Sequence, residues 1–138
     1  MSAASSSDEH NREIMREAAN NVSSELVECG AYFQITSEAL RRTGRTASAD
    51  SYEASSDLAL NRAFDAAQIG RTSQMAEKVT LARYELSVKD MIAEIDNDMS
   101  NISILLNKYA TRCKMVIERP ERIMEEWGNK AMSKESID

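Results

Sequence analysis

The side chains that could do chemistry are few, because the 138 residues include only two cysteines and one histidine. Cys29 and Cys113 lie far apart in the sequence, and each falls on a stripe of apolar residues. One interpretation is two buried free thiols, since free cysteine behaves as a small hydrophobic residue. The other is a disulfide that joins two helices, which would stabilise the fold by about 4 kcal/mol in the chain-entropy model.

The chain has few of the residues from which catalytic and metal-binding sites are usually built. His10 lies close to the N-terminus, which argues against a Ser/His or Cys/His catalytic pair. A di-iron bundle needs Glu-x-x-His on two helices, and a structural zinc site needs more Cys and His ligands than this chain has. The carboxylates Glu28, Glu38, Asp96 and Asp98 remain as acid–base candidates. We therefore predict that the protein is not an enzyme and carries no metal or cofactor.

The composition predicts an all-α protein. One Pro and four Gly leave little to interrupt helices, and residues that favour helix are plentiful. The net charge of -6 disfavours nucleic acid as a partner, because phosphate backbones are repelled. No apolar run is long enough to span a membrane. We expect one bundle domain over 8–132, a flexible tail at 1–7 and a frayed tail at 133–138.

Steps of three and four positions between apolar residues predict the helices. Helices are expected to begin at the capping residues Ser7, Ser48 and Ser73 and to end at Gly44 and Gly70. Two apolar series on the third helix are both expected on its buried side. The first series is Met75, Val79, Ala82, Leu86 and Ala93, and the second is Val88, Ile92 and Ile95. The expected helices cover about 8–43, 48–69, 73–95, 102–117 and 120–132, the last with a proline at its first position.

The polar cluster at 96–101 leaves two topologies open. Periodicity would allow one unbroken helix over 73–117, whereas Asp, Asn and Ser would suit a turn and a new capped helix. With a rise of about 1.5 Å per residue, the turn brings Cys113 level with Cys29, and the unbroken helix separates them. The turn and the disulfide together predict an antiparallel four-helix bundle with a short additional C-terminal helix. The competing interpretation is the unbroken helix with two free thiols, in an oligomer.

Aromatic residues near the cysteines are the candidate binding residues. Tyr32 and Phe33 follow the first cysteine, and Tyr109 lies one helical turn before the second. If the bridge forms, they cluster in one layer, which is either core packing or a small apolar pocket between helices. Trp127, on the last helix, either caps the bundle or contacts a partner.

Two segments carry a resemblance. Residues 28–33 read Glu-Cys-Gly-Ala-Tyr-Phe, and Cys113 is followed by Pro-Glu-Arg at 120–122 and by Trp127. This arrangement resembles uncharacterised small exported helical proteins of Gram-negative bacteria, which carry an early Cys near aromatic residues and a late Cys before a Pro-acidic-Arg segment. The resemblance implies export and a bridge between Cys29 and Cys113, and it brings no catalytic residues.

These observations predict a non-catalytic, exported (periplasmic) helical bundle that acts as a binding or accessory module. The expected partner is an unidentified protein or a small apolar ligand, and a homo-oligomer is a further expectation. The alternative is a cytosolic structural or oligomerising protein with a long unbroken third helix. Because residues 1–7 lack the apolar stretch of a signal peptide, the periplasmic location requires that a signal peptide has been removed, and the location is cytoplasmic otherwise.

Overall fold

The computed structural model describes residues 2–137, and side chains over 7–134. The regular elements in this range are all helical, which confirms the predicted all-α class. The helices are α1 (Ser2–Arg42), α2 (Thr46–Ala67), α3 (Ser73–Glu94), α4 (Ser103–Glu118) and α5 (Pro120–Ile137), with a short 3-10 turn, η1 (Met99–Asn101). None of these helices is both long enough and apolar enough to cross a membrane.

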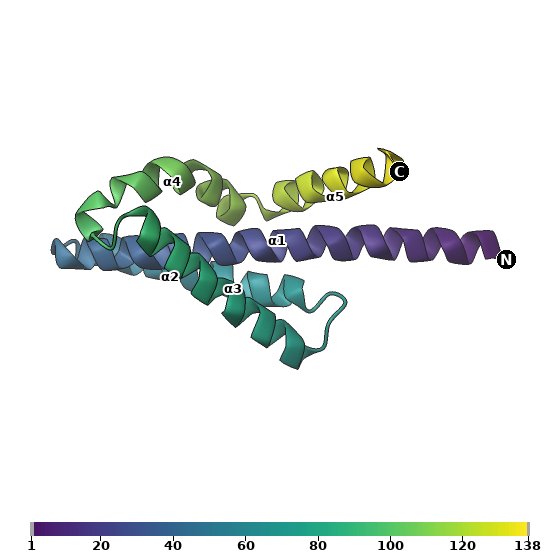
Figure 1. Cartoon of the computed structure of the whole chain (residues 1–138), viewed down its shortest axis with the longest axis horizontal. Helices are drawn as coiled ribbons and strands as arrows, with labels where there is room; N and C mark the ends of the chain where they lie inside the picture. The colour runs from purple at the N-terminus through teal and green to yellow at the C-terminus, as the bar shows by residue number, and fades with distance from the viewer. Residues whose placement is uncertain (1, 138) are drawn as a thin grey trace.

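The helices are arranged around α1, which runs along the whole molecule (Figure 1). α2 turns back and lies antiparallel against α1, and α3 then crosses obliquely toward the C-terminal end of α1. α4 and α5 follow one another along another side of α1, and α5 lies beside its first half. Successive helices therefore reverse direction as far as α4, and α5 continues in the direction of α4.

The middle of α1 is buried on almost every side. Among residues 26–39, only Glu28 and Glu38 are exposed. The sequence of this stretch explains the burial, because apolar and small residues occupy nearly all of its positions, and a helix that is apolar all round is stable only inside a core. The central segment of α1 is thus the axis of the hydrophobic core.

Small residues bring α1 and α2 into close contact. They recur at every seventh position and so form one line along each helix: Ser23, Gly30 and Ser37 on α1, and Ala49, Ser56 and Ala63 on α2. Gly30 lets Leu60 approach closely, because an added Cβ would lie 2.8 Å from Cδ2 of Leu60 and would force that side chain to shift. Three buried hydroxyls cross the contact and donate to backbone carbonyl oxygens: Ser23 to Ala63 (2.8 Å), Ser56 to Gly30 (2.8 Å) and Ser37 to Ala49 (2.9 Å).

The ends of α1 and α2 were predicted better than the beginnings of α2 and α3. Gly44 (φ +80°) and Gly70 (φ +85°) adopt the left-handed conformation expected after α1 and α2. α2 begins before Ser48, with no side-chain cap. Thr72 caps α3 in place of Ser73, because its extended backbone lets its hydroxyl accept from the amide of Met75.

α1 begins at Ser2 rather than after Ser7. Residues 2–7 are alanine and serine, with no Gly or Pro to end a helix that is already formed. At the other end of the chain, α5 begins at Pro120 as predicted, and it continues to Ile137 rather than stopping near Met132. The division into one domain and two tails stays a prediction.

The chain turns after α3, so the predicted turn within 96–101 is confirmed and the unbroken helix is wrong. Asp96 (φ 55°) and Asn97 (φ 53°) both adopt the left-handed conformation, which Asp and Asn tolerate better than most residues. The Asp98 carboxylate then accepts from the amide of Ser100 (3.0 Å) and caps η1. These local hydrogen bonds compete with continuation of the helix.

One expected buried series on α3 is on the wrong side. Of its five residues, Met75, Val79, Ala82, Leu86 and Ala93, only Val79 is even partly buried. The second series is placed correctly, with Ile95 buried and its two other members partly buried. α3 carries apolar residues on two faces, and periodicity alone could not show which one meets α1.

The serine contacts between α1 and α2 give a first prediction. Ser56→Val removes the hydrogen bond to Gly30 and adds volume where the helices are closest, so we expect the free energy of unfolding to fall by about 2 kcal/mol. Urea denaturation measures this fall. Ser51→Val, at an exposed position of the same helix, is the matched control and should cost less than 1 kcal/mol, about the helix-propensity difference. Equal losses in the two variants would contradict the proposed role of the contact.

Candidate functional site

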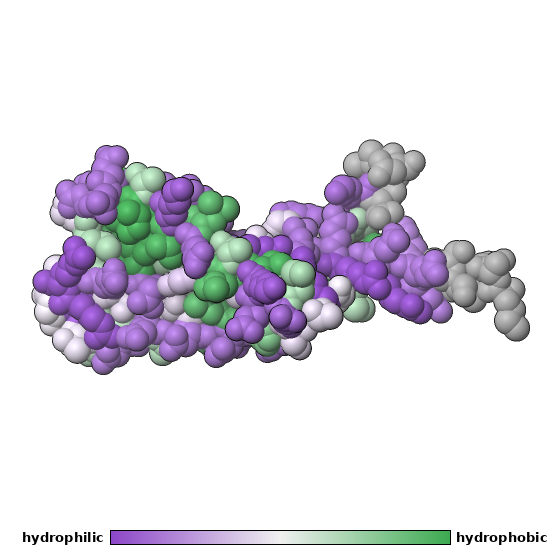
Figure 2. Space-filling model, turned by 60° about the horizontal axis from the view of Figure 1, so that its bottom comes forward, coloured by the Kyte–Doolittle hydropathy of each residue, from purple (hydrophilic) through white to green (hydrophobic). Residues whose placement is uncertain are grey.

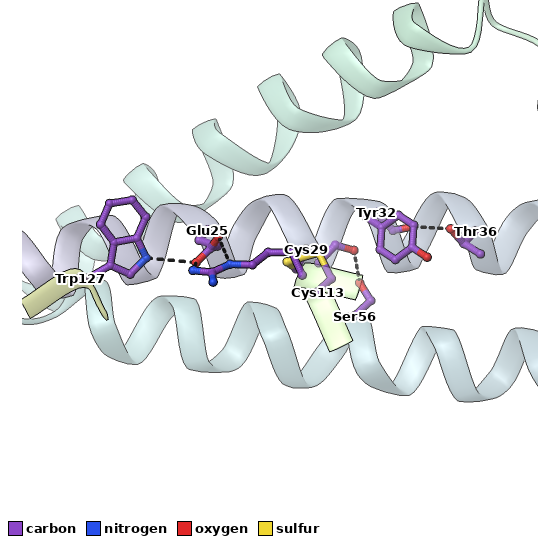
Figure 3. Close-up of a disulfide and its surroundings, with 9 residues drawn as sticks. Glu25, Cys29, Tyr32, Thr36, Ser56, Cys113 and Trp127 are labelled. Carbon is purple, nitrogen blue, oxygen red and sulfur yellow. Dashed lines mark hydrogen bonds and ion pairs between the residues drawn. A yellow bond between two sulfur atoms is a disulfide. The ribbon is translucent and has the colours of Figure 1, made fainter. Parts of the chain in front are cut away.

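A disulfide joins Cys29 of α1 to Cys113 of α4, with the two Cα atoms 5.4 Å apart (Figure 3). Both cysteines are buried. Within the part of the chain that the structure describes, no cysteine is free. The bridge closes a loop that contains α2 and α3, and it fixes the distance between α1 and α4.

A hydrogen-bonded ion cluster lies one turn along α1 from the bridge (Figure 3). Arg112 donates from Nε and Nη2 to the two carboxylate oxygens of Glu25, at 2.9 and 2.8 Å. Its Nη1 donates to Glu126 at 2.7 Å, and Trp127 Nε1 donates to Glu25 at 3.1 Å. One guanidinium thus ties α1, α4 and α5 together beside the disulfide.

The charges in this cluster favour the ionised forms. Burial is the largest single influence on Glu25 and opposes its ionisation, but the hydrogen bonds from Arg112 and Trp127 together hold its pKa below the ordinary value. The same contact with Glu25 raises the pKa of Arg112. A bidentate arginine–carboxylate contact of this kind is strong and has a fixed geometry.

Trp127 lies against the protein itself. Its indole is partly buried, and Lys130 Nζ lies 4.4 Å from the centre of its ring. With Glu25, it lines a small cavity of about 200 Å³. Its expected contact with a partner stays a prediction.

Four aromatic rings pack together on the other side of the disulfide. The ring of Tyr32 lies 5.3 Å from that of Phe33, 5.9 Å from that of Tyr109 and 6.5 Å from that of Tyr52 (centroid distances). Burial raises the pKa of Tyr32 to about 12. The hydroxyl of Tyr109 donates to Glu94 of α3 at 3.0 Å. The three aromatic residues singled out in the sequence therefore do meet, and Tyr52 joins them.

Two cavities lie on either side of Tyr52, and together we call them the α2–α4 groove. The first has a volume of about 410 Å³, and Tyr32 and Phe33 line it, whereas Tyr109 does not. The second, of about 550 Å³, extends toward η1. The other lining residues of the first cavity are Ser51, Ser55, Ala110, Lys114, Ile117 and Glu118. The second is lined, besides Tyr52, by Thr36, Ala39, Leu40, Thr43, Arg45, Ser48, Met99, Ser100, Ile102 and Leu106.

Sequence reasoning missed Tyr52 as a candidate binding residue. Its ring lies 6.0 Å from that of Phe33 because the α1–α2 hairpin folds the two segments together. No local pattern around Tyr52 indicates this contact. Arg112 was missed for the same reason, since Glu25 becomes its partner only after folding.

The remaining candidates form no reactive cluster. Glu28, Glu38, Asp96 and Asp98 are all exposed, the first two on α1 and the others in the turn before α4. No group of three or more His, Cys, Asp or Glu in the described range could hold a metal ion.

Asn20 of α1 contacts two arginines, Arg71 in the connection between α2 and α3 and Arg83 of α3. Its Oδ1 accepts from Arg71 (2.7 Å) and from Arg83 (2.6 Å). Burial and the neighbouring charge of Arg71 lower the pKa of Arg83. This contact holds α3 against α1 at a cost in repulsion between two like charges.

Comparison of the chain with family models, with curated proteins and with solved structures finds no match. The geometry of the groove and of the contacts that hold its walls therefore carries the functional argument.

The ion cluster gives a prediction about pH. Because the pKa of Glu25 is lowered in the folded protein, its contribution to stability is complete above the unfolded-state pKa and is lost as the pH falls through the folded-state pKa. We expect Glu25→Gln to lower the free energy of unfolding by about 1 to 2 kcal/mol at neutral pH, and by progressively less in acid. Denaturant unfolding across this pH range tests the expectation, with the exposed Glu121→Gln as control. A loss that does not vary with pH would count against it.

The disulfide gives a prediction about redox conditions. Reduction of the wild-type protein should lower the free energy of unfolding by about 4 kcal/mol, because the long loop between the cysteines is no longer closed in the unfolded chain. Denaturation with and without reductant measures the change. The double variant Cys29→Ala/Cys113→Ala should show no response to reductant. An unchanged wild-type midpoint would show that the bridge does not form in solution.

Proposed function

We propose that this protein is a non-catalytic, exported helical module that binds a small, elongated apolar ligand in the α2–α4 groove. The observation that carries the proposal is the pair of adjoining cavities that share Tyr52. Their volumes, about 410 and 550 Å³, fall within the range of small-molecule sites. No cluster of reactive groups accompanies them among the described residues.

The proposed scaffold is an antiparallel four-helix bundle in which α5 extends the line of α4. Both walls of the groove are attached to its floor, α1. The serine hydrogen bonds hold α2 against α1, and the disulfide holds α4. A site whose walls are fixed before binding loses less entropy when a ligand enters.

The lining indicates the chemistry of the ligand. Phe33, Ile117 and Leu106 supply apolar surface along the groove, and serine and threonine hydroxyls lie between them. Lys114 at one end has Glu118 beside it in the same lining. Arg45 lines the other cavity and forms no ion pair within the described residues. This pattern suits a linear apolar molecule with one acidic group directed toward Arg45.

Export is supported by the disulfide, since structural disulfides persist mainly in oxidising compartments. The resemblance to small exported helical proteins of Gram-negative bacteria points the same way and makes the periplasm the proposed location. The competing cytosolic interpretation depended on an unbroken third helix, and the chain turns after Glu94 instead.

A dansyl-labelled undecanoic acid tests the proposed function, because it combines a linear apolar chain with one carboxylate. We expect a saturable rise in fluorescence with the oxidised protein. Ser55→Phe should fill the groove and weaken binding by about tenfold or more, equivalent to about 1.4 kcal/mol. The matched control is Ala54→Phe, at an exposed neighbouring position outside the lining.

Circular dichroism confirms that each variant is folded before the titration. Equal binding by the two phenylalanine variants would place the ligand outside the groove. The absence of saturable binding to the wild-type protein would overturn the proposal.

A further inference from the structure

α3 presents a line of apolar side chains to solvent. Met75 is 50% exposed and Leu86 is 60% exposed, and Val79 and Ala82 lie between them on the same face. In Figure 2, hydrophobic residues gather at the surface of the half of the molecule away from the N-terminus, where α2 and α3 lie. We call these four residues the α3 stripe.

The α3 stripe has the spacing of a coiled-coil seam. Its residues are separated by steps of four, three and four positions, which is the alternation of heptad positions a and d. A helix that only closes the core of its own chain needs one apolar face, and α3 already buries Ala76 and Met91 on another face. The stripe is therefore not needed for the packing of the monomer.

Charged residues flank the stripe in a definite order. Lys78 and Glu85 are exposed, lie seven positions apart and follow one edge of the stripe. Arg83 and Asp90 follow the other edge, where Asp90 is exposed and Arg83 is partly buried and donates to Asn20 of α1. Neither Lys78 nor Glu85 forms an ion pair with any residue in the described part of the chain.

We propose that the α3 stripe pairs with the same stripe of a second copy of this chain, antiparallel and about a two-fold axis. In this register Met75 lies opposite Leu86 of the partner subunit, and Val79 lies opposite Ala82 of the partner subunit. An isologous contact of this kind repeats each pairing by symmetry. The dimer interface then consists of four apolar layers, each formed by one stripe residue from each of the two α3 helices.

The charges select this orientation. In the antiparallel register, Lys78 lies beside Glu85 of the partner subunit, and symmetry repeats the attraction. A parallel coiled coil would instead lose this attraction and would place Glu85 beside Asp90 of the partner subunit. Like charges at these flanking positions oppose pairing, so the sequence on both edges of the stripe favours the antiparallel dimer.

The position of α3 leaves room for a second copy. The first half of α3 diverges from α1 and lies on the outside of the molecule (Figure 1). The α2–α4 groove is formed by other residues, so the dimer does not depend on the proposed ligand.

Sedimentation equilibrium of the full, oxidised chain tests the dimer and its register. We expect the wild-type protein to be dimeric at high concentration and to dissociate on dilution. Lys78→Glu and Glu85→Lys should each raise the dissociation constant by about tenfold or more, because each replaces two attractions by two repulsions. The double variant Lys78→Glu/Glu85→Lys should restore wild-type association, since the charges are only exchanged.

Two further variants complete the experiment. Leu86→Glu should abolish association while the far-ultraviolet circular dichroism stays unchanged, because the leucine is exposed in the monomer. Glu121→Lys, an exposed charge reversal on α5, should leave association unchanged. A wild-type protein that is monomeric at every concentration would overturn the proposal, as would a dimer that is insensitive to the single charge reversals. A double variant that stays dissociated would overturn the antiparallel register.

Discussion

Burial of the central part of α1 on nearly every side is the constraint on which the other contacts depend. A helix that is apolar all round must be covered by several neighbours, and each one is attached by a different interaction. Serine hydrogen bonds and the close approach at Gly30 attach α2, and the disulfide attaches α4. The Glu25–Arg112 cluster adds α5 to the same assembly.

The groove is a consequence of this arrangement. α2 and α4 are each held against α1, but they contact one another little. The aromatic rings of Tyr32, Phe33 and Tyr52 occupy part of the space between them without filling it. The two helices thus leave a space between them although each is attached to α1, and this space is the proposed binding site.

Among the described residues, α3 carries more exposed large apolar side chains than any other helix: Met75, Leu81 and Leu86. Its contacts with α1 include Asn20, whose amide oxygen accepts from two arginines. The opposite face keeps Met75 and Leu86 at the surface, although burial of each would be worth roughly 2 kcal/mol. In the proposed dimer, a second copy of the chain supplies the missing cover without any change in the fold.

The sequence by itself determined the features that depend on neighbours along the chain. The helical class, the ends at Gly44 and Gly70 and the start at Pro120 follow from backbone preferences of single residues, whereas the sequence left the turn after α3 open beside an unbroken helix. Only the tertiary structure decided which face of α3 is buried, that Tyr52 joins the aromatic cluster and that Glu25 binds Arg112. These outcomes depend on residues from separate helices, whose distances are set by how all the helices pack on α1.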